Sequence, residues 1–319
     1  MDSTLQPMST SQVLDRTFHL YRNYFLLFAG ISIITPALAL MVELGFAALG
    51  YAPGSRMHLA REQELIMSLL YSFSILVIAL FGGALAQGAA VYAVSKVYLG
   101  ESITIGESFK SVLGRFGTIL RIFISISLRI SAPYLIVVLV FVLLFASIGA
   151  MGGRGGPGAA ALFGIGALLG LLLLIGAFVW SLYLYSKYAL AIPACLLEKL
   201  GATDAIRRSG FLTQGSIMRI VLIFILLGVL TLVLNLVLSL PSEIYAFQHH
   251  NLMTLPLVLW KYLANFFASA LAGPVATIAI ALVFYDQKVR KEAFDLQLMM
   301  QALEPLPQPG MATNASVGQ

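Results

Sequence analysis

Few side chains in this sequence are of types that do chemistry, and they form no recognisable catalytic arrangement. There is no GxSxG turn to expose a serine nucleophile and no HExxH helix to hold zinc between two imidazoles. No GxxxxGK[ST] phosphate-binding loop occurs, and no pair of aspartates lies inside an apolar stretch. The adjacent side chains of His249 and His250 point apart, which favours a solvated loop over a metal site. We therefore predict no enzyme activity, no catalytic residue, no metal and no cofactor.

The polar side chains that remain are three amides inside long apolar stretches, Gln87, Asn235 and Asn265. An unpaired polar group is costly in lipid, so we expect each amide to hydrogen-bond to a neighbouring helix. The alternative is that they line a polar pathway across the membrane. Glu43 ends the first apolar stretch and is expected at the outer interface, exposed to water.

The elements that carry these residues follow from composition. The chain is 60% hydrophobic and 10% charged, with a mean hydropathy of +0.93, whereas a soluble domain carries about 25% charged residues. Stretches without Asp, Glu, Lys or Arg that are long enough to cross a membrane as helices run over 23–42, 65–95, 131–151, 159–186, 220–242 and 262–285. The predicted fold is an all-α polytopic membrane protein with six transmembrane helices. Cys195, the single cysteine, excludes a disulfide within the chain.

The distribution of charge predicts the topology. Most lysines and arginines lie before the first span or in every second loop, and the opposite loops hold only Arg56, Arg61, Arg154 and Lys261. The positive-inside rule then places both termini in the cytoplasm. This placement also explains the net charge of +5 without nucleic-acid binding. No basic residue precedes Arg16, so we interpret the first span as retained rather than as a cleaved signal.

Three basic stretches resemble one another and begin at Thr10, Ile105 and Ala202. Aligning Gln12, Glu107 and Asp204 brings two further sets into register, namely Leu14 with Phe109 and Ile206, and Thr17 with Val112 and Ser209. Each stretch precedes two spans, which predicts three repeats of an interfacial elbow helix plus a hairpin. The alternative is that these are ordinary basic loops that obey the positive-inside rule.

The expected elbow helices have capping signals and basic faces. Ser9 with Gln12 and Thr104 with Glu107 fit the capping box, and Thr203 or Asp204 is expected to cap the third helix. Arg121 and Arg129 are assigned to the second elbow, with Arg129 reaching toward lipid phosphates; a buried functional arginine is the alternative. The expected contacts to lipid headgroups are Arg16, Arg22, Lys110, Arg115, Arg121, Arg129, Arg207 and Arg208.

The predicted organisation has four parts. Residues 1–22 form a cytoplasmic amphipathic segment and residues 23–285 the transmembrane domain. Residues 286–303 form a cytoplasmic amphipathic helix, and residues 304–319 a disordered tail. Small residues such as Gly82, Ala86 and Ala90 are expected to let helices pack within the bundle, with a homodimer face as the alternative.

Three segments carry a resemblance to a known family: Ser11–Phe25, Ala191–Ile220 and Phe284–Met300. Together they resemble the bacterial membrane family named after the membrane domain of glycerophosphoryl diester phosphodiesterases, over about 9–300. In that family the phosphodiesterase activity belongs to a separate soluble barrel with a histidine-arginine-glycine motif and metal-binding carboxylates. This chain has no such motif, so the resemblance implies a stand-alone multi-pass module of the bacterial inner membrane.

These observations favour a non-catalytic inner-membrane module that scaffolds or anchors other components. Its expected partners are anionic membrane lipids and a partner protein or a second copy of the chain, and not nucleic acid. One alternative is a transporter or permease subunit with a polar pathway between the repeats. A second is a lipid-acting intramembrane enzyme that uses Asp204, Arg207 and Arg208.

Overall fold

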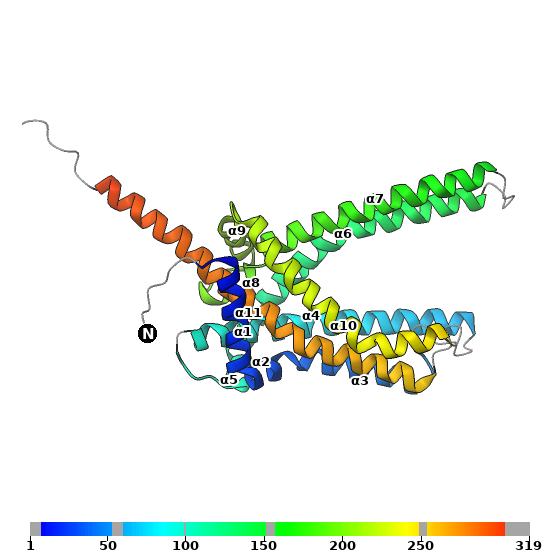
Figure 1. Cartoon of the computed structure of the whole chain (residues 1–319), viewed down its shortest axis with the longest axis horizontal. Coiled ribbons are helices and arrows are strands. Elements are labelled where there is room, and N and C mark those ends of the chain that lie inside the picture. Colours follow the sequence, from blue (N-terminus) through cyan, green and yellow to red (C-terminus); the bar gives the residue numbers. More distant parts are fainter. Residues whose placement is uncertain (1–7, 53–59, 99, 151–156, 249–253, 304–319) are drawn as a thin grey trace, which may run out of the picture.

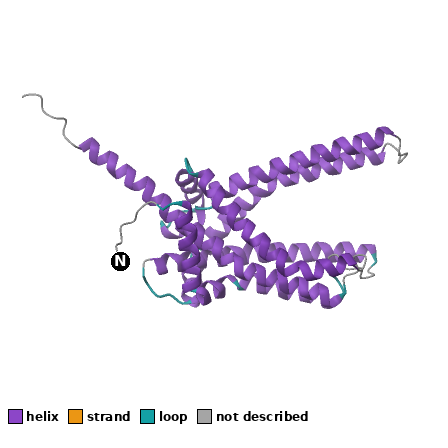
Figure 2. Ribbon diagram, viewed as in Figure 1, coloured by secondary structure: helices purple, strands orange, loops and turns teal. Residues whose placement is uncertain are grey.

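A computed structural model describes residues 8–52, 60–98, 100–150, 157–248 and 254–303. Every regular element in these ranges is a helix (Figures 1 and 2). The helices are α1 (Thr10–Asn23), α2 (Phe25–Ser32), α3 (Ile34–Ala48), α4 (Arg61–Tyr98), α5 (Ile105–Leu113), α6 (Phe116–Ala150), α7 (Pro157–Tyr188), α8 (Ala191–Leu197), α9 (Ala202–Thr213), α10 (Ile217–Gln248) and α11 (Leu255–Leu303). Within the described residues, five helices are long and apolar enough to cross a membrane, or six if the bent pair α2–α3 is one span. The predicted all-α polytopic membrane fold is confirmed.

The long helices form two groups that diverge from one end of the molecule (Figure 1). Helices α6 and α7 pair along their length and point away from the bundle formed by α2–α3, α4, α10 and α11. The short helices α1, α5, α8 and α9 gather where the two groups meet. We call this region the basic end, because the cations expected to contact headgroups lie on or beside these helices. The far tips of the long helices are called the opposite end.

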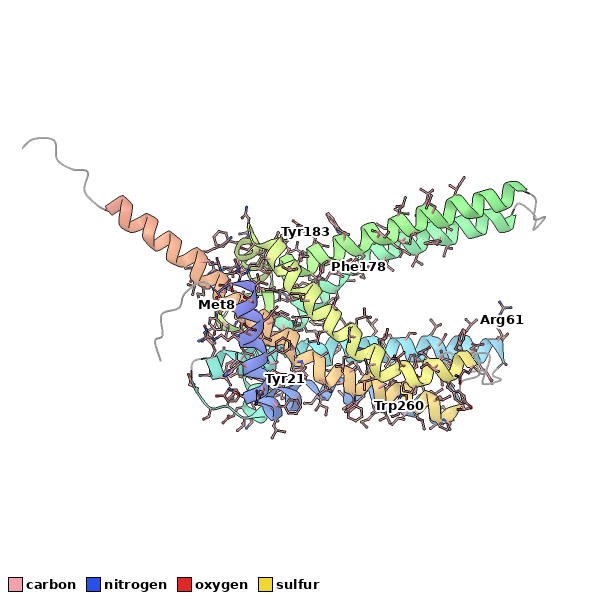
Figure 3. All side chains as sticks on the ribbon, in the orientation of Figure 1. Met8, Tyr21, Arg61, Phe178, Tyr183 and Trp260 are labelled. Carbon is pink, nitrogen blue, oxygen red and sulfur yellow. The ribbon has the colours of Figure 1, made fainter. Side chains whose placement is uncertain are left out.

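Helix α11 is the central helix of the bundle. In the 18-residue apolar segment of α11, 61% of the residues are buried. The corresponding segments of α4 and α6 are 6% buried, and those of α7 and α10 are 17% buried. Along α6 and α7 the side chains stand out into the surroundings, as at Phe178 (Figure 3). The core therefore lies around α11, and the α6–α7 pair is held mainly through its basic end.

The first predicted span is broken rather than continuous. Helices α2 and α3 meet at Ile33 with a bend of 42°. Pro36 explains the break, because proline has no N–H to donate to the carbonyl of Ser32 and its ring clashes with that carbonyl.

Several other boundaries differ from the sequence-based predictions. Arg121 and Arg129 lie inside α6 and not in the second elbow, which ends at Leu113. The expected separate helix over 286–303 is the continuation of α11. Helix α8 falls in a segment for which the sequence analysis predicts no helix, and its residues from Ala191 to Cys195 are buried. The predictions for the His249–His250 loop and for the tail at 304–319 lie outside the described residues.

Small residues allow the helices to approach closely within the chain. A Cβ atom added to Gly82 would lie 3.1 Å from Oγ1 of Thr35 on α3, and one added to Gly88 would lie 3.0 Å from a Val112 methyl on α5. A Cβ atom on Gly170 would lie 2.0 Å from the Phe141 ring on α6. The contacts of Gly82 agree with the predicted packing within the bundle.

Candidate functional site

Three of the short helices, α1, α5 and α9, correspond to the predicted elbows, and the predicted N-caps of α1 and α5 are confirmed. Ser9 caps α1 and Thr104 caps α5, each in a complete capping box with Gln12 and Glu107 respectively. The Thr104 hydrogen bonds also lower the pKa of the exposed Glu107 carboxyl. The predicted cap of α9 is wrong: its N-cap is Gly201, which has no side chain to offer. Because the chain turns into the helix at Ala202, the Asp204 carboxylate lies in the first turn, near the positive end of the helix dipole.

The same register of each short helix faces the core. Val13 and Thr17 are buried in α1, Ser108 and Val112 in α5, and Ala205 and Ser209 in α9. Ser209 shows how such a position joins elements, because its hydroxyl donates to the carbonyl of Lys187 and accepts from the N–H of Leu190.

Asp286 on α11 holds the start of the described chain in place. Its carboxylate accepts hydrogen bonds from the N–H of Met8 at 2.7 Å, from Arg219 at 2.7 Å and from Arg290 at 3.0 Å. Both arginines also donate to the carbonyl of Met8. The carboxylate is 1% exposed, and a buried charge is tolerated only when it is paired in this way. This Asp286 cluster joins the segment before α1 to α10 and α11.

A second ionic cluster joins α8, α9 and α11. Arg208 donates to both oxygens of Glu198, at 2.8 and 2.9 Å, and pairs with Glu292. Lys288 lies 3.3 Å from Glu198. Burial raises the pKa of Glu198, but the hydrogen bonds and charges of Arg208 and Lys288 outweigh burial, so the pKa lies below its usual range. Glu198 is therefore a carboxylate at neutral pH, and Arg208 is paired with acids of the protein itself.

The cations expected to contact lipid fall into two groups. Arg208, Arg115, Arg16 and Arg129 have partners in the protein. Arg115 donates to the carbonyl of Cys195 at the end of α8, and Arg16 stacks over Tyr98 with its guanidinium carbon 5.0 Å from the ring centroid. The others are exposed and form no ion pair within the described part of the chain: Arg22, Lys110, Arg121 and Arg207.

The three amides do not converge. The Asn235 side chain donates to the carbonyl of Thr231 in its own helix at 3.1 Å, not to another helix as expected. The Asn265 amide on α11 lies beside the carboxyl group of Glu43 on α3, so it has a polar neighbour on another helix. Gln87 on α4 lines a cavity elsewhere. The structure thus places these residues in three separate surroundings.

The expectation that Glu43 is exposed to water is wrong. Its side chain is buried, because α3 continues to Ala48 and packs against α11. The hydroxyl of Tyr262, also on α11, is buried nearby without a hydrogen-bond partner in the described residues.

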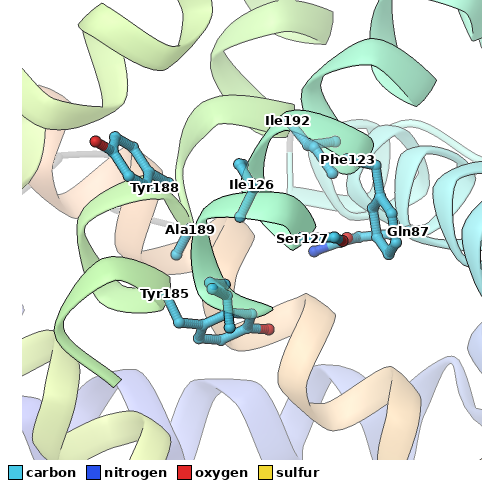
Figure 4. A pocket seen from close by; sticks show the side chains of 9 residues that line it. Gln87, Phe123, Ile126, Ser127, Tyr185, Tyr188, Ala189 and Ile192 are labelled. Atoms are coloured by element: carbon cyan, nitrogen blue, oxygen red, sulfur yellow. The ribbon is translucent and has the colours of Figure 1, made fainter. Parts of the chain in front are cut away.

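A cavity lies where the α6–α7 pair meets α4 and α8 (Figure 4). Its volume is about 80 Å³, and it is partly open to the surroundings. The lining is mostly apolar, with Gln87, Ser127 and two tyrosines as the polar members: Gln87, Phe123, Ile126, Ser127, Ile130, Tyr185, Tyr188, Ala189 and Ile192. The cavity is therefore suited to an apolar or amphiphilic group.

Two further findings bear on function. No group of three or more His, Cys, Asp or Glu side chains that could hold a metal occurs among the described residues. No family model, curated protein or solved structure matches the chain.

The Asp286 and Glu198 clusters and the cavity could not be recognised from sequence. In the sequence these clusters are only charges that flank apolar stretches, and nothing in the spacing of Asp286, Arg219, Lys288 and Arg290 identifies their partners. The usable signal was an aspartate directly after an apolar stretch, where a carboxylate needs a cation.

Proposed function

We propose that this chain is a non-catalytic integral membrane module whose basic end binds anionic lipid headgroups and presents a fixed platform to other components. The observation that supports the proposal is the division among its cations. Asp286 and Glu198 are neutralised inside the protein by Arg208, Arg219 and Arg290, whereas Arg22, Arg121 and Arg207 are exposed at the same end and pair with no acid among the described residues. A basic residue at an anionic surface gains about 1 kcal/mol.

The proposal includes the membrane and the topology. A basic end that faces the cytoplasmic leaflet follows the positive-inside rule. The described chain begins at this end, and the last part of α11 projects beyond it on the same side of the molecule (Figure 1). The bacterial inner membrane is the location that the family resemblance implies.

We also propose that the three units of short helix plus long pair are repeats. Support comes from the buried positions, because the alignment of Thr17 with Val112 and Ser209 brings together three fully buried residues. Leu14, Phe109 and Ile206 likewise all pack against the core from half-buried positions. Basic loops that share only composition have no reason to share the register of burial.

Neither alternative function gains a specific observation. A polar pathway requires the amides to line a common route, and they lie in separate surroundings. A lipid-acting enzyme requires Asp204, Arg207 and Arg208 to act together, but Arg208 is engaged by Glu198 and Glu292.

Extraction of the protein in polymer-bounded membrane discs, followed by mass spectrometry of the surrounding lipid, tests the proposed function. We expect anionic lipid to be enriched around the wild-type chain. The enrichment should be lost in the triple variant Arg22→Glu, Arg121→Glu and Arg207→Glu. Arg61→Glu reverses an exposed charge at the opposite end and is the matched control. Equal enrichment in the triple variant and the control would refute the proposal.

A further inference from the structure

We propose that the cavity between α4, α6, α7 and α8, together with Arg129 and Lys187 at its edge, binds a single glycerophospholipid through its phosphate, its ester groups and part of an acyl chain. The inference rests on the proposed lipid-binding function and names a specific site within it.

Two cations share one aromatic ring at the edge of the cavity. The guanidinium carbon of Arg129 lies 5.2 Å from the centroid of the Tyr188 ring, and Nζ of Lys187 lies 5.6 Å from the same centroid. The ring attracts both cations and orients them. Neither forms an ion pair within the part of the chain that the structure describes. Two cations beside one ring make this edge of the cavity positive, which favours an anion there, and a phosphate offers several oxygens to such donors.

The cavity itself contains polar groups that lack partners. Gln87 from α4 and Ser127 from α6 both line the cavity (Figure 4), and neither side chain forms a hydrogen bond among the described residues. A polar group left unpaired in apolar surroundings costs free energy, so a ligand that supplies acceptors is favoured there. The ester carbonyls of a glycerolipid accept hydrogen bonds, and both the amide and the hydroxyl can donate them.

The remaining walls suit hydrocarbon. Phe123, Ile126, Ile130 and Ile192 enclose most of the cavity. Its volume of about 80 Å³ accommodates a segment of an acyl chain and not a whole lipid. The rest of the acyl chain can lie against the exposed apolar side chains of the α6–α7 pair, such as Leu135 and Leu139.

The position along the helices matches a headgroup boundary. Helix α7 ends at Tyr188, and the charge-free part of α6 begins directly after Arg129. Arg129 therefore lies beside the end of its partner helix, at the level where polar headgroups meet hydrocarbon. An occupant with phosphate above and hydrocarbon below is a phospholipid of the same leaflet and not a free anion.

Native mass spectrometry of the full chain in mild detergent tests the site, with dioleoyl phosphatidylglycerol as the probe. We expect the wild-type chain to retain one phospholipid. Arg129→Ala with Lys187→Ala should weaken the apparent affinity by about tenfold for each cation removed. Ala189→Trp should abolish retention by filling the cavity. Arg61→Ala with Lys261→Ala is the matched control and should retain the lipid, because these exposed cations lie at the opposite end and neither line the cavity nor contact Tyr188.

Three results would overturn the site: no retained lipid in the wild-type chain, equal retention in the Arg129/Lys187 variant, or displacement of the lipid by excess inorganic phosphate. Gln87→Leu with Ser127→Ala replaces Ala189→Trp if the latter does not fold, and it should also weaken retention. The two lipid proposals fail separately. Loss of the retained lipid with normal enrichment of anionic lipid in membrane discs refutes this site alone. The converse result refutes the role of the exposed cations and leaves the site standing.

Discussion

The bundle around α11 and the α6–α7 pair are built from the same apolar residue types, yet they differ in what covers them. Most of the apolar segment of α11 is buried against other helices, whereas only a small part of the apolar segments of α6 and α7 is buried. In water the exposed apolar surface of α6 and α7 would be strongly unfavourable. In lipid an exposed leucine costs nothing, so packing is decided by small residues and polar contacts rather than by hydrophobicity. The bundle is held by buried ion pairs to α11, whereas the α6–α7 pair contacts the rest of the protein mainly near the basic end.

The largest expected effect is loss of the Asp286 cluster. Asp286→Ala leaves Arg219 and Arg290 facing each other without an acid and removes the acceptor of the Met8 N–H. Breaking a buried ion pair in this way costs about 3–5 kcal/mol. We expect a large drop in the thermal unfolding midpoint in detergent. Glu243→Ala, which removes an exposed pair with Lys261 at the opposite end, is the control and should change little. Equal midpoints would show that the Asp286 cluster does not hold the bundle.

Two glycine variants compare the groups directly. Gly88→Val forces a side chain against Val112 and Ile119 at the basic end, where overpacking costs about 1–3 kcal/mol. Gly170→Val forces one against Phe141 within the α6–α7 pair. We expect Gly88→Val to lower the midpoint of global unfolding. Gly170→Val should instead raise the labelling of single cysteines introduced into α6 and α7, in a background that lacks Cys195, while leaving that midpoint nearly unchanged. If Gly170→Val destabilised the whole chain equally, the pair would not be a separate unit.

Acid should weaken the tie between α9 and α11. Because the pKa of Glu198 is lowered in the folded protein, its contribution is fully present above the usual glutamate pKa. It is lost as the pH falls through the lower folded value. Glu198→Gln should cost about 1–3 kcal/mol at neutral pH, and the difference from wild type should shrink in strong acid. Thermal unfolding over a pH series measures this, and a difference that stayed constant with pH would contradict the ion-pair account.

The smallest expected effect concerns the caps. Thr104→Ala removes the cap of α5, which joins α4 to the base of α6, and should cost about 1 kcal/mol. Gly201→Asn adds a side chain at the uncapped start of α9 and should stabilise by only a few tenths of a kcal/mol. Equilibrium unfolding of both variants checks the ranking. A larger loss of stability in Gly201→Asn than in Thr104→Ala would contradict this ranking.

The sequence predicted the parts of this molecule that depend on local chemistry. The apolar stretches became long helices, and the capping boxes of Ser9 and Thr104 formed because their atoms lie within one helical turn. The errors arose where partners are distant. Glu43 was placed by counting residues along one helix, but its burial depends on α11, over 200 positions later. Helix α8 was missed because it is short, and its burial depends on packing against α4 and α9.

The unbroken course of α11 has a mechanical consequence. The helix contains 49 residues, which corresponds to about 70 Å, more than twice the thickness of a bilayer core. Asp286 fixes it between its two ends rather than at either one. A rod held at an interior point is a lever, so a tilt of the part among the apolar helices displaces the projecting end in the opposite direction. The end of α11 that such a tilt would move lies about 25 Å beyond the pivot.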